Sequence, residues 1–541
     1  MKILGLDISL SKKSKDIVEV NQVEEPQSRG NYNTGYSRVI HYQRYDGEKN
    51  LGEIGPVTDY ALDYESLRLR SWKAYLDSEI AQSVVKKYVK WVIGSGLKLQ
   101  CEPVLRVLRQ EGYDINKEEF SNEVEARFKV YSKSKMSCFN NEMTLHKIMN
   151  TAYLNAVVGG DALVVLRVIK GDLKIQLYDG GCLASNMNIN DKIVNGVEYD
   201  DNGSVVAYHL VKKGNILKTE RIKAYNGGFR VAFLFKGLTY RMHNNRGIPL
   251  ISTVLEVISK LDRYKEATVG SAEELNKLVY QIVHQSYSSG ENPASALLTK
   301  AFDVGDNAGQ NIPVDEQGRE LANNIAVSTN KQAFNNPVGA EIKPVTGGTK
   351  ELYFRDFMTI NIELVCAALA IPPEVAMSKY DSNFSASRAA LKDWEHTINV
   401  ERSFFQEEFM QHIYDFWLYI EVLKGKIRVN GLLKAVQSGN QYAMNAFTQS
   451  RFVGANVPHI DPLKEVKAER EKLGSSGKHI PLTTVEQATE TLNGGDSVSN
   501  IEQYSDELRM TNELDIPTTQ EEKAENSNDN SDDEEGEEEE N

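Results

Sequence analysis

Histidine and cysteine are the residues of this chain that most readily bind a metal ion or act as nucleophiles. Nine histidines and four cysteines are present among 541 residues. None is spaced with another His, Cys or Glu as a metal site requires, and no CxxC pair occurs. We interpret His396 and His412, on one aromatic helical pattern, as hydrogen-bonded structural residues. The scattered cysteines are typical of reduced thiols in a protein that is assembled in a cytoplasm.

One segment, Gly474 to Lys478, superficially resembles a phosphate-binding loop. It lacks the first glycine of such loops and the Ser or Thr after the lysine, so we interpret it as a turn. No GxSxG nucleophile motif is present, and Cys366 falls on a helical pattern as a small core residue. The acidic pairs Asp200-Asp201 and Asp532-Asp533 lie in a turn and in the tail. The sequence therefore predicts a non-enzymatic protein without a metal or cofactor.

The charge of the chain is distributed unevenly. The formal net charge is -15, but residues 521–541 hold 12 acidic residues and one lysine, a net of -11, so the other 520 residues carry -15 + 11 = -4. A tight duplex binder would be basic overall or along one stripe. Any contact of this chain with DNA should therefore be weak or local.

Hydrophobic residues make up 40% of the chain, which is ordinary for a soluble globular protein. The longest apolar runs, such as Ala162–Leu166 and Val365–Ile371, are far shorter than the ~20 residues that a membrane span needs. The apolar start Ile3–Leu6 is broken at once by Asp7, which argues against a signal peptide. We therefore expect no membrane partner.

The elements that must position any site follow from periodicity. The first ~50 residues are polar and irregular, and a helical pattern begins near Tyr60 and stops at Gly94 and Gly96. Further helices are predicted over 117–131 and 143–158. Residues 161–240 are rich in strand-forming residues and have regularly spaced turn signals, which indicates an antiparallel sheet.

A long helical pattern runs from Pro249 to Gln285, and its 37 residues would span ~55 Å at 1.5 Å per residue. Its charges exclude a membrane span, and periodicity alone leaves a core helix and a packed helical array equally open. A loop-rich module follows over 286–349, and then a helix over 351–370 that Pro372-Pro373 stops. Apolar residues from Leu391 to Ile420 predict another long helix.

Six sequence blocks, in the correct order between about Tyr60 and Gln503, resemble those of the portal proteins of tailed bacteriophages, specifically the lambda-type family. Two blocks depart from the family pattern: Phe384 and Ala386 stand where tyrosine and serine are commoner, and Phe452 stands where tryptophan is usual. The blocks are Tyr64–Ser71 with Val92–Leu97; Gly159–Leu163 with Leu177–Asp179; Gly196–Asp200 with Gly203 and Ala207–His209; Arg246–Leu250; Ile371–Pro373 with Asn383–Arg388; and Ile460–Glu465.

The resemblance implies an α+β portal fold with a mixed wing domain, a long helical stem, a small clip domain and a helical crown. It labels residues 1–55 as an irregular N-terminal arm, 56–243 as the wing, 244–285 as stem helix 1, 286–349 as the clip, 350–372 as stem helix 2, 373–388 as the tunnel loop, 389–490 as the wing return and crown helices, and 491–541 as an acidic disordered tail. A long charged helix then fits a stem that packs against copies of itself.

The function that the resemblance implies is a ring, usually of twelve subunits, at the portal vertex of a virion that is assembled in the host cytoplasm. Its channel would pass double-stranded DNA non-specifically during packaging and ejection. The terminase large subunit would supply the motor, because the chain has no phosphate loop. A head-completion or adaptor protein, and a major capsid or scaffolding protein, would be the other partners.

The resemblance also implies two sets of site residues. The tunnel loop at the DNA channel would include Tyr380, Asp381, Ser382, Asn383, Phe384, Ser385, Ser387 and Arg388. The oligomer contacts of the stem would include Val254, Ile258, Leu261, Leu275 and Val279. We expect Arg388 to hold its loop through a carboxylate or a carbonyl rather than to grip phosphate.

Two other functions are compatible with parts of the sequence. A non-enzymatic intracellular scaffold or adaptor without DNA contact would explain the missing active site but not the ordered blocks, and its mass would distinguish it from a large closed ring. A nuclease or protease could use scattered acids and histidines, and a chelator-sensitive activity would support it.

Overall fold

The computed structural model describes most of the chain between residues 64 and 513. The described segments are 64–184, 192–212, 215–239, 244–282, 323–328, 331–335, 354–379, 384–455, 462–474, 481–493, 495 and 497–513, with the paired strands β1 (Lys2–Ile3) and β2 (Leu6–Asp7). This strand pair lies inside the arm that we predicted to be irregular. The acidic residues 521–541 lie outside the described segments.

The body begins with a layer of helices. In α3 the apolar residues explain why the chain is helical: Val84, Val85, Tyr88 and Val92 recur at helical spacing and are buried on one face. Gly94 and Gly96, with φ of 56° and 108°, then end the helix. The helices of this layer are α2 (Tyr64–Asp77), α3 (Glu79–Val92), α4 (Leu105–Gln110), α5 (Lys117–Lys133) and α6 (Leu145–Gly159), with a short 3-10 turn at Lys135–Ser137.

The predicted antiparallel sheet is present as several small sheets. A three-stranded sheet has the order β12-β4-β5, and a four-stranded sheet has the order β6-β7-β8-β9. The pairs β10-β11 and β3-β16 are two-stranded. The strands are β3 (Lys98–Cys101), β4 (Asp161–Ile169), β5 (Asp172–Asp179), β6 (Ile193–Val194), β7 (Val197–Tyr199), β8 (Val205–Lys212), β9 (Asn215–Lys223), β10 (Tyr225–Asn226), β11 (Phe229–Arg230), β12 (Ala232–Lys236) and β16 (Ser450–Val453); a 3-10 turn, Gly180–Cys182, follows β5.

Strand β4 is buried on both faces, because two hydrophobic clusters lie on opposite sides of it. Val164 and Leu166 belong to the main core, which the helices cover. Leu163 and Val165 point the other way, into a smaller cluster with Tyr208 of β8. This alternation is the two-residue period of a strand, and it explains why residues 162–166 form a continuous apolar run.

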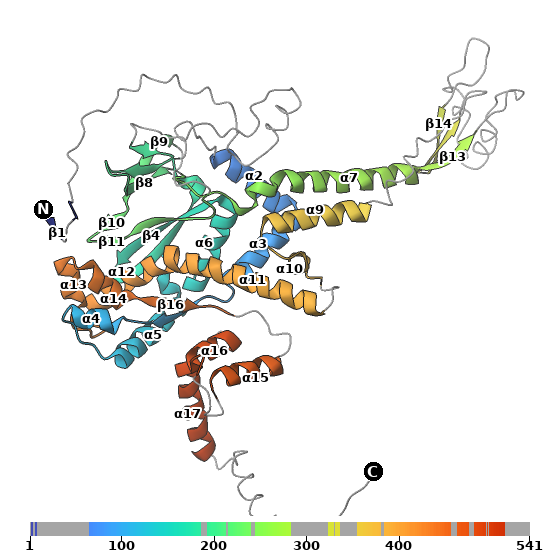
Figure 1. Ribbon diagram of the computed structural model, residues 1–541. Helices are drawn as coiled ribbons and strands as arrows, with labels where there is room; N and C mark the ends of the chain where they lie inside the picture. Colours follow the sequence, from blue (N-terminus) through green and yellow to red (C-terminus); the bar gives the residue numbers. More distant parts are fainter. Residues whose placement is uncertain are drawn as a thin grey trace, which may run out of the picture.

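Two helices project from this body side by side (Figure 1). They are α7 (Leu255–Lys277), which follows a 3-10 turn at Leu250–Val254, and α9 (Phe354–Ala368). At the far end lie β13 (Leu278–Ile282), β14 (Asn323–Ser328) and β15 (Lys331–Asn335), in the sheet order β13-β15-β14. The remaining residues of 286–349 lie outside the described segments.

The helix predicted to continue to Gln285 is wrong at its C-terminal end. α7 ends at Lys277, and residues 278–282 pair in parallel with β15. Leu278-Val-Tyr-Gln-Ile282 is rich in β-branched and aromatic residues, which favour a strand once a partner strand is present. Val279 therefore lies on a strand and not on a stem helix.

The C-terminal half returns to the body as one long helical rod. Its apolar stripe from Trp394 to Ile420 is buried as the periodicity predicts, and a π-helical turn, Gln406–Met410, divides it. The helices are α10 (Pro373–Met377), α11 (Phe384–Phe405), α12 (Gln411–Leu423), α13 (Leu432–Ser438), α14 (Gln441–Thr448), α15 (Pro462–Lys472), α16 (Val485–Asn493) and α17 (Ser497–Glu513).

The prediction of disorder from residue 491 onward is wrong for residues 497–513. They form α17, whose side chains are mostly exposed. Glutamate, glutamine, methionine and arginine are strong helix formers, and Val498, Ile501, Tyr504 and Leu508 follow the helical period. The low aromatic content of the segment hid this pattern.

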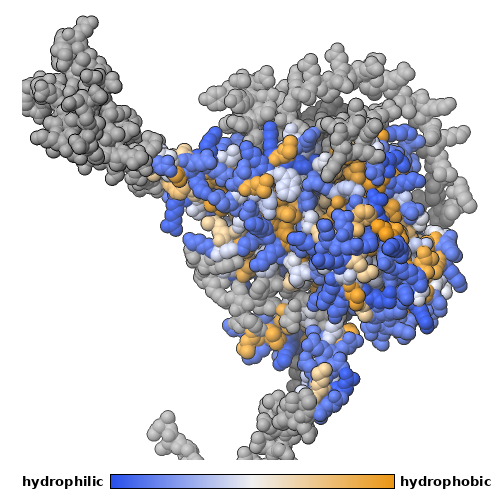
Figure 2. Space-filling model, turned by 180° about the vertical axis from the view of Figure 1, so that it is seen from behind, coloured by the Kyte–Doolittle hydropathy of each residue, from blue (hydrophilic) through white to orange (hydrophobic). Residues whose placement is uncertain are grey.

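The coarse fold class is confirmed as a mixture of helices and sheets. The face in Figure 2 is mostly hydrophilic with small hydrophobic patches. Across the part of the chain that the structure describes, no helix is both long and apolar enough to cross a bilayer.

The stability of the body should depend on pH through the carboxyl group of Asp415 on α12. Burial raises the pKa of its carboxyl to about 6, although hydrogen bonds with Gln411 and Thr448 act in the opposite direction. The folded protein therefore holds a proton that the unfolded chain releases near pH 4, and stability falls as the pH rises from about 4 to 6. We expect Asp415→Asn to stabilise the protein by about 1–3 kcal/mol at pH 7.5 and by much less at pH 4.

Urea denaturation at the two pH values checks this prediction. Asp393→Asn, on the exposed face of α11, is the matched control and should change neither curve. An Asp415→Asn variant that is less stable than the parent at pH 7.5 would contradict the expected cost of the buried carboxylate.

Candidate functional site: the base of the helical projection

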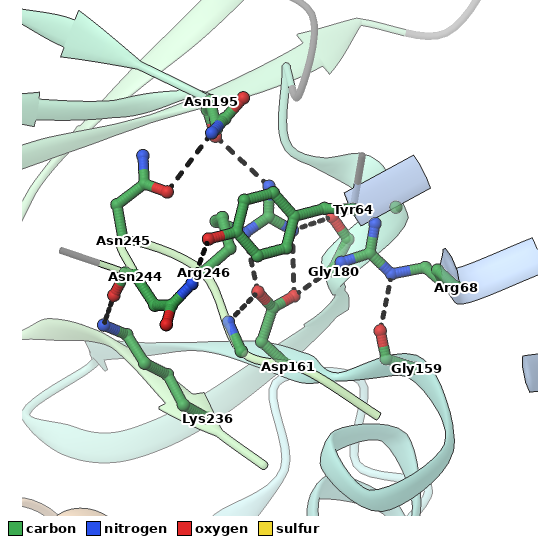
Figure 3. A network of polar contacts seen from close by, with 12 residues as sticks. Tyr64, Arg68, Gly159, Asp161, Gly180, Asn195, Lys236, Asn244, Asn245 and Arg246 are labelled. Carbon is green, nitrogen blue, oxygen red and sulfur yellow. Dashed lines mark hydrogen bonds and ion pairs between the residues drawn. The ribbon is translucent and has the colours of Figure 1, made fainter. Parts of the chain in front are cut away.

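A buried carboxylate lies where the projection joins the body (Figure 3). Asp161 accepts two hydrogen bonds from Arg246, from Nε to Oδ2 at 2.6 Å and from Nη2 to Oδ1 at 2.8 Å. Arg68 Nη2 donates to Oδ1 at 2.9 Å. The exposed fractions are 0% for Asp161 and Arg246 and 5% for Arg68. We name these three residues the buried ion cluster.

The cluster joins three parts of the chain that are distant in sequence. Arg68 lies on α2, Asp161 begins β4 directly after α6, and Arg246 precedes the 3-10 turn that leads into α7. Backbone groups complete the shell, because Arg68 Nε donates to Gly159 O at 2.8 Å and Arg246 Nη2 donates to Gly180 O at 2.7 Å. The start of the projection is thus fixed to the sheet and to α2.

Two glycines make room for these charges. A Cβ atom on Gly180 would lie 1.8 Å from Asp161 Oδ1, and one on Gly247 would lie 2.0 Å from the carbonyl oxygen of Gly160. Real Cβ contacts are never so short, so both positions require glycine. The Gly247 amide uses the space to donate to Asp161 Oδ2 at 3.1 Å.

The electrostatics of the cluster indicate a structural role. Burial raises the pKa of Asp161, but the attraction and hydrogen bonds of Arg246 and the charge of Arg68 outweigh burial and lower the pKa below its ordinary value. Burial lowers the pKa of Arg68, against the attraction of Asp161. Asp161 is fully buried, so its carboxylate holds chain segments together and does not meet a substrate.

Helix α3 holds the far side of the base. Ser83 Oγ donates to Ala376 O of α10 at 2.6 Å, and Tyr88 Oη donates to Leu369 O just after α9. Lys87 Nζ donates to Ser378 Oγ at 2.5 Å. Successive turns of α3 thus hold the segment that runs from the end of α9 to Ser378.

The two projecting helices pack against each other through aromatic rings. Tyr264 of α7 stacks on Phe354 of α9, with ring centroids 5.6 Å apart, and contacts Phe357 at 4.5 Å. Lys265 of α7 pairs with Glu79 of α3 at 2.8 Å. The base is therefore a packed assembly of α2, α3, α7, α9 and α10.

The predicted tunnel loop over 373–388 is only partly a loop. Residues 373–377 form α10, and α11 begins at Phe384, so Phe384, Ser385, Ser387 and Arg388 are helical. Ala386, Arg388, Ala389 and Ala390 are strong helix formers and override the short polar residues beside them. Tyr380, Asp381, Ser382 and Asn383 lie outside the described residues. Arg388 Nη2 lies 3.6 Å from Glu465 Oε1, so its described partner is a carboxylate.

The predicted stem contacts are wrong for three residues. Val254, Ile258 and Leu261 have exposed fractions of 2%, 1% and 1% and belong to the main core of their own subunit. Periodicity located the helix face but could not tell a core from a subunit interface. Leu275 lies on α7 and Val279 on β13, and their side chains lie outside what the structure describes.

Sequence reasoning missed an apolar stripe on α9. Phe357, Ile360 and Leu364 are exposed by 39%, 56% and 58%, and their spacing of three and four residues places them on one face. It also missed the buried ion cluster, although Arg68, Asp161 and Arg246 stand in three of the six family blocks. A charged residue beside glycine was the available signal for Asp161 and Arg246, whereas Arg68 stands between Leu67 and Leu69 and had no such signal.

The described residues of this base do not form a metal site. Among the described residues, no group of three or more His, Cys, Asp or Glu side chains is placed to hold a metal ion. The two guanidiniums of the cluster bind carbonyls and a carboxylate of the chain itself.

Comparison with known families agrees with this geometry. The family model described as phage portal protein, lambda family, matches residues 48–402, which is more than half of the chain and includes the buried ion cluster and the whole projection. The chain belongs to the lambda family of phage portal proteins. The predicted family is thereby confirmed; five of the six blocks lie within the matched residues, and the block Ile460–Glu465 lies outside them. No curated protein matches the chain.

Solved structures of gene transfer agent (GTA) particles have chains similar to this portal-family chain. One, in the neck of an empty GTA particle with C6 symmetry, has 10% identity and a TM-score of 0.41, with 79% of this chain and 92% of that chain covered. Another, in the virion of a native GTA particle, has the same identity and coverage and a TM-score of 0.39. A third, in the neck of a native GTA particle with C12 symmetry, has 12% identity and a TM-score of 0.31, with 72% and 94% covered.

The buried ion cluster should dominate the stability of the base. In Asp161→Asn the two guanidiniums remain buried without their counter-charge, and loss of one partner from a buried ion pair typically costs about 3–5 kcal/mol. We expect a loss of that size at pH 7, measured by urea denaturation. Because the pKa of Asp161 is lowered, the contribution is present above pH 4 and is lost only as the pH falls below the ordinary carboxyl range.

Asp172→Asn is the matched control on the neighbouring strand. Asp172 pairs with Lys424 at 2.6 Å, but their side chains are 41% and 26% exposed, so the loss should stay below about 1 kcal/mol. Equal losses of unfolding free energy in the two variants would show that the buried ion cluster does not dominate the stability of the base.

Proposed function

We propose that the chain is the subunit of a portal ring at one vertex of a phage capsid, where its channel passes double-stranded DNA during packaging and ejection. Membership of the lambda portal family carries this proposal. The two-helix projection supports it, because a stem needs paired helices that are held at a fixed angle to the body. The ring would act as a non-enzymatic channel, and a terminase large subunit would supply the motor.

The parts of the subunit follow from this function. Residues 56–243 would form the wing, α7 and α9 the stem, residues 286–349 the clip, and the helices after α11 the wing return and crown. Residues 380–383, between α10 and α11, would approach the channel as the tunnel loop. The clip would receive the terminase and later the head-completion protein, and the wing would face capsid or scaffolding protein.

The exposed stripe of α9 is the proposed stem contact between subunits, in place of the buried residues of α7. An apolar stripe of this kind on a projecting helix is unfavourable in water and becomes favourable when a neighbouring subunit covers it. Twelve copies would bury this stripe around the ring.

Ring assembly tests the proposal. Wild-type protein should form closed rings in negative-stain images and mass photometry, and Ile360→Asp with Leu364→Asp should leave folded monomers. The control is Leu423→Asp on α12, because Leu423 is 60% exposed, like the two stem residues, but lies on the body. A wild-type protein that remains monomeric at every concentration would favour the scaffold or adaptor function instead.

The tunnel loop gives a second test. Replacing residues 380–383 with a Gly-Ser turn should leave rings intact, because α10 and α11 keep their packing, and should reduce the DNA that each capsid holds. The measurement is DNA length per particle after packaging. Normal filling would show that this segment does not act in the channel.

A further inference from the structure

Three lysines of α3 lie near Ser378, which precedes the proposed tunnel loop in the chain and accepts a hydrogen bond from Lys87. Lys90 lies four residues after Lys86 and three residues after Lys87, so its side chain neighbours both of the others, although the adjacent Lys86 and Lys87 are about 100° apart around the helix. Lys86 and Lys90 are exposed and Lys87 is half-buried. We name them the lysine edge.

The lysine edge has no carboxylate partner within the described residues. Lys86 Nζ donates to Gln82 Oε1 at 2.6 Å, and Lys87 Nζ reaches only the hydroxyl of Ser378. Other lysines of the same region do pair, such as Lys265 with Glu79 and Lys392 with Glu395. Burial, and then the charge of Lys90, lowers the pKa of Lys87, which shows positive charge without local compensation.

Few acidic residues lie around α3, and two of them already have a hydrogen-bond or ion-pair partner. Glu395 pairs with Lys392, and the half-buried Glu401 of α11 accepts a hydrogen bond from Tyr153. Glu374 is the acidic residue of α10, which packs on α3. The lysine edge therefore keeps a local positive charge in a body whose net charge is close to neutral.

The lysines stand on a rigid support. The opposite face of α3 is buried in the main core through Val84 and Val85. Arg402 of α11 closes the C-terminal end of α3, with Nε donating to Val92 O at 3.0 Å and Nη2 to Trp91 O at 2.8 Å. The backbone of the lysine edge is therefore fixed in place, and binding has to order only the flexible lysine side chains.

We propose that Lys86, Lys87 and Lys90 contact the phosphate backbone of the duplex as it passes the tunnel loop. The proposal rests on the proposed portal function. Each DNA strand carries one phosphate per about 3.4 Å of axis, and lysines at helical steps of three and four have Cβ atoms about 5–6 Å apart, so one lysine edge reaches several phosphates of one strand.

The chemistry suits a moving duplex. Lysine ammonium groups bind phosphate as point charges without reading base sequence. Three lysines from one subunit bind weakly at physiological salt, and the same edge repeats on the next subunit. The duplex is thereby guided along the channel without being held at one register.

The salt dependence of DNA binding by assembled rings tests the proposal. Fluorescence anisotropy of a short mixed-sequence duplex is measured between about 50 and 200 mM salt. In the triple variant Lys86→Gln, Lys87→Gln, Lys90→Gln, the slope of log K against log salt should fall by about 0.9 for each phosphate that the variant no longer neutralises. Affinity at the lower salt should fall by at least about tenfold, and arginine at the three positions should restore most of the slope.

The control removes the same charge elsewhere. Lys129 and Lys133 of α5 and Lys434 of α13 are exposed and lie at the opposite end of the body from the projection (Figure 1). Their triple glutamine variant should keep the wild-type slope. Equal slopes in the two triple variants would overturn the proposal.

Three further outcomes separate this proposal from the portal function itself. Triple variants of the lysine edge that remain folded monomers would show that the lysines bind carboxylates of a neighbouring subunit, which also overturns the DNA contact. Wild-type rings that package DNA normally, with an unchanged slope in the variant, would reject the lysine edge and leave the portal function standing. Wild-type protein without rings would reject the portal function.

Discussion

The Asp161 carboxylate between two buried guanidiniums is the interaction on which the geometry of the subunit depends. A buried charge is tolerated only where its partners are fixed in place. The cluster therefore imposes one arrangement on α2, the start of β4 and the residues that lead into α7. Glycines at 180 and 247 allow the backbone to approach the charges closely. The direction in which α7 leaves the body is set by this buried contact together with the packing of Ile258 and Leu261 in the core and of Tyr264 on α9.

Helix α3 is the second fixed element, and it links regions that perform different tasks. Its buried face belongs to the core, Arg402 of α11 satisfies carbonyls at its C-terminal end, and its side chains hold the segment between α9 and Ser378. Both boundaries of residues 380–383 are thus attached to α3, one through α10 and the other through α11.

Much of the fold could be predicted from the sequence because local periodicity determines it. The rod from Trp394 to Ile420, the helix that Pro372-Pro373 ends and the strands after Asp161 all follow from spacing and turn residues. Long-range partners decide the rest. Leu278–Ile282 becomes a strand because β15 is present, and Ile258 is a core residue because the body covers it. The buried ion cluster could not be derived from spacing, since its two arginines stand 93 and 85 positions from Asp161 in the chain.

The π-helical turn at Gln406–Met410 has a consequence for how related sequences can vary in length. Such a turn is what one additional residue produces inside an otherwise regular α-helix. Each residue of an α-helix turns the chain by about 100°. The π turn takes up that residue, so α12 keeps the orientation that it would have in a regular α-helix one residue shorter. A regular α-helix of the present length would instead rotate α12 by about 100° and move Phe416 and Ile420 out of the core that they now fill. Homologues can therefore lose one residue at this turn by making it α-helical, whereas a single insertion or deletion elsewhere in the rod would rotate α12 against the core.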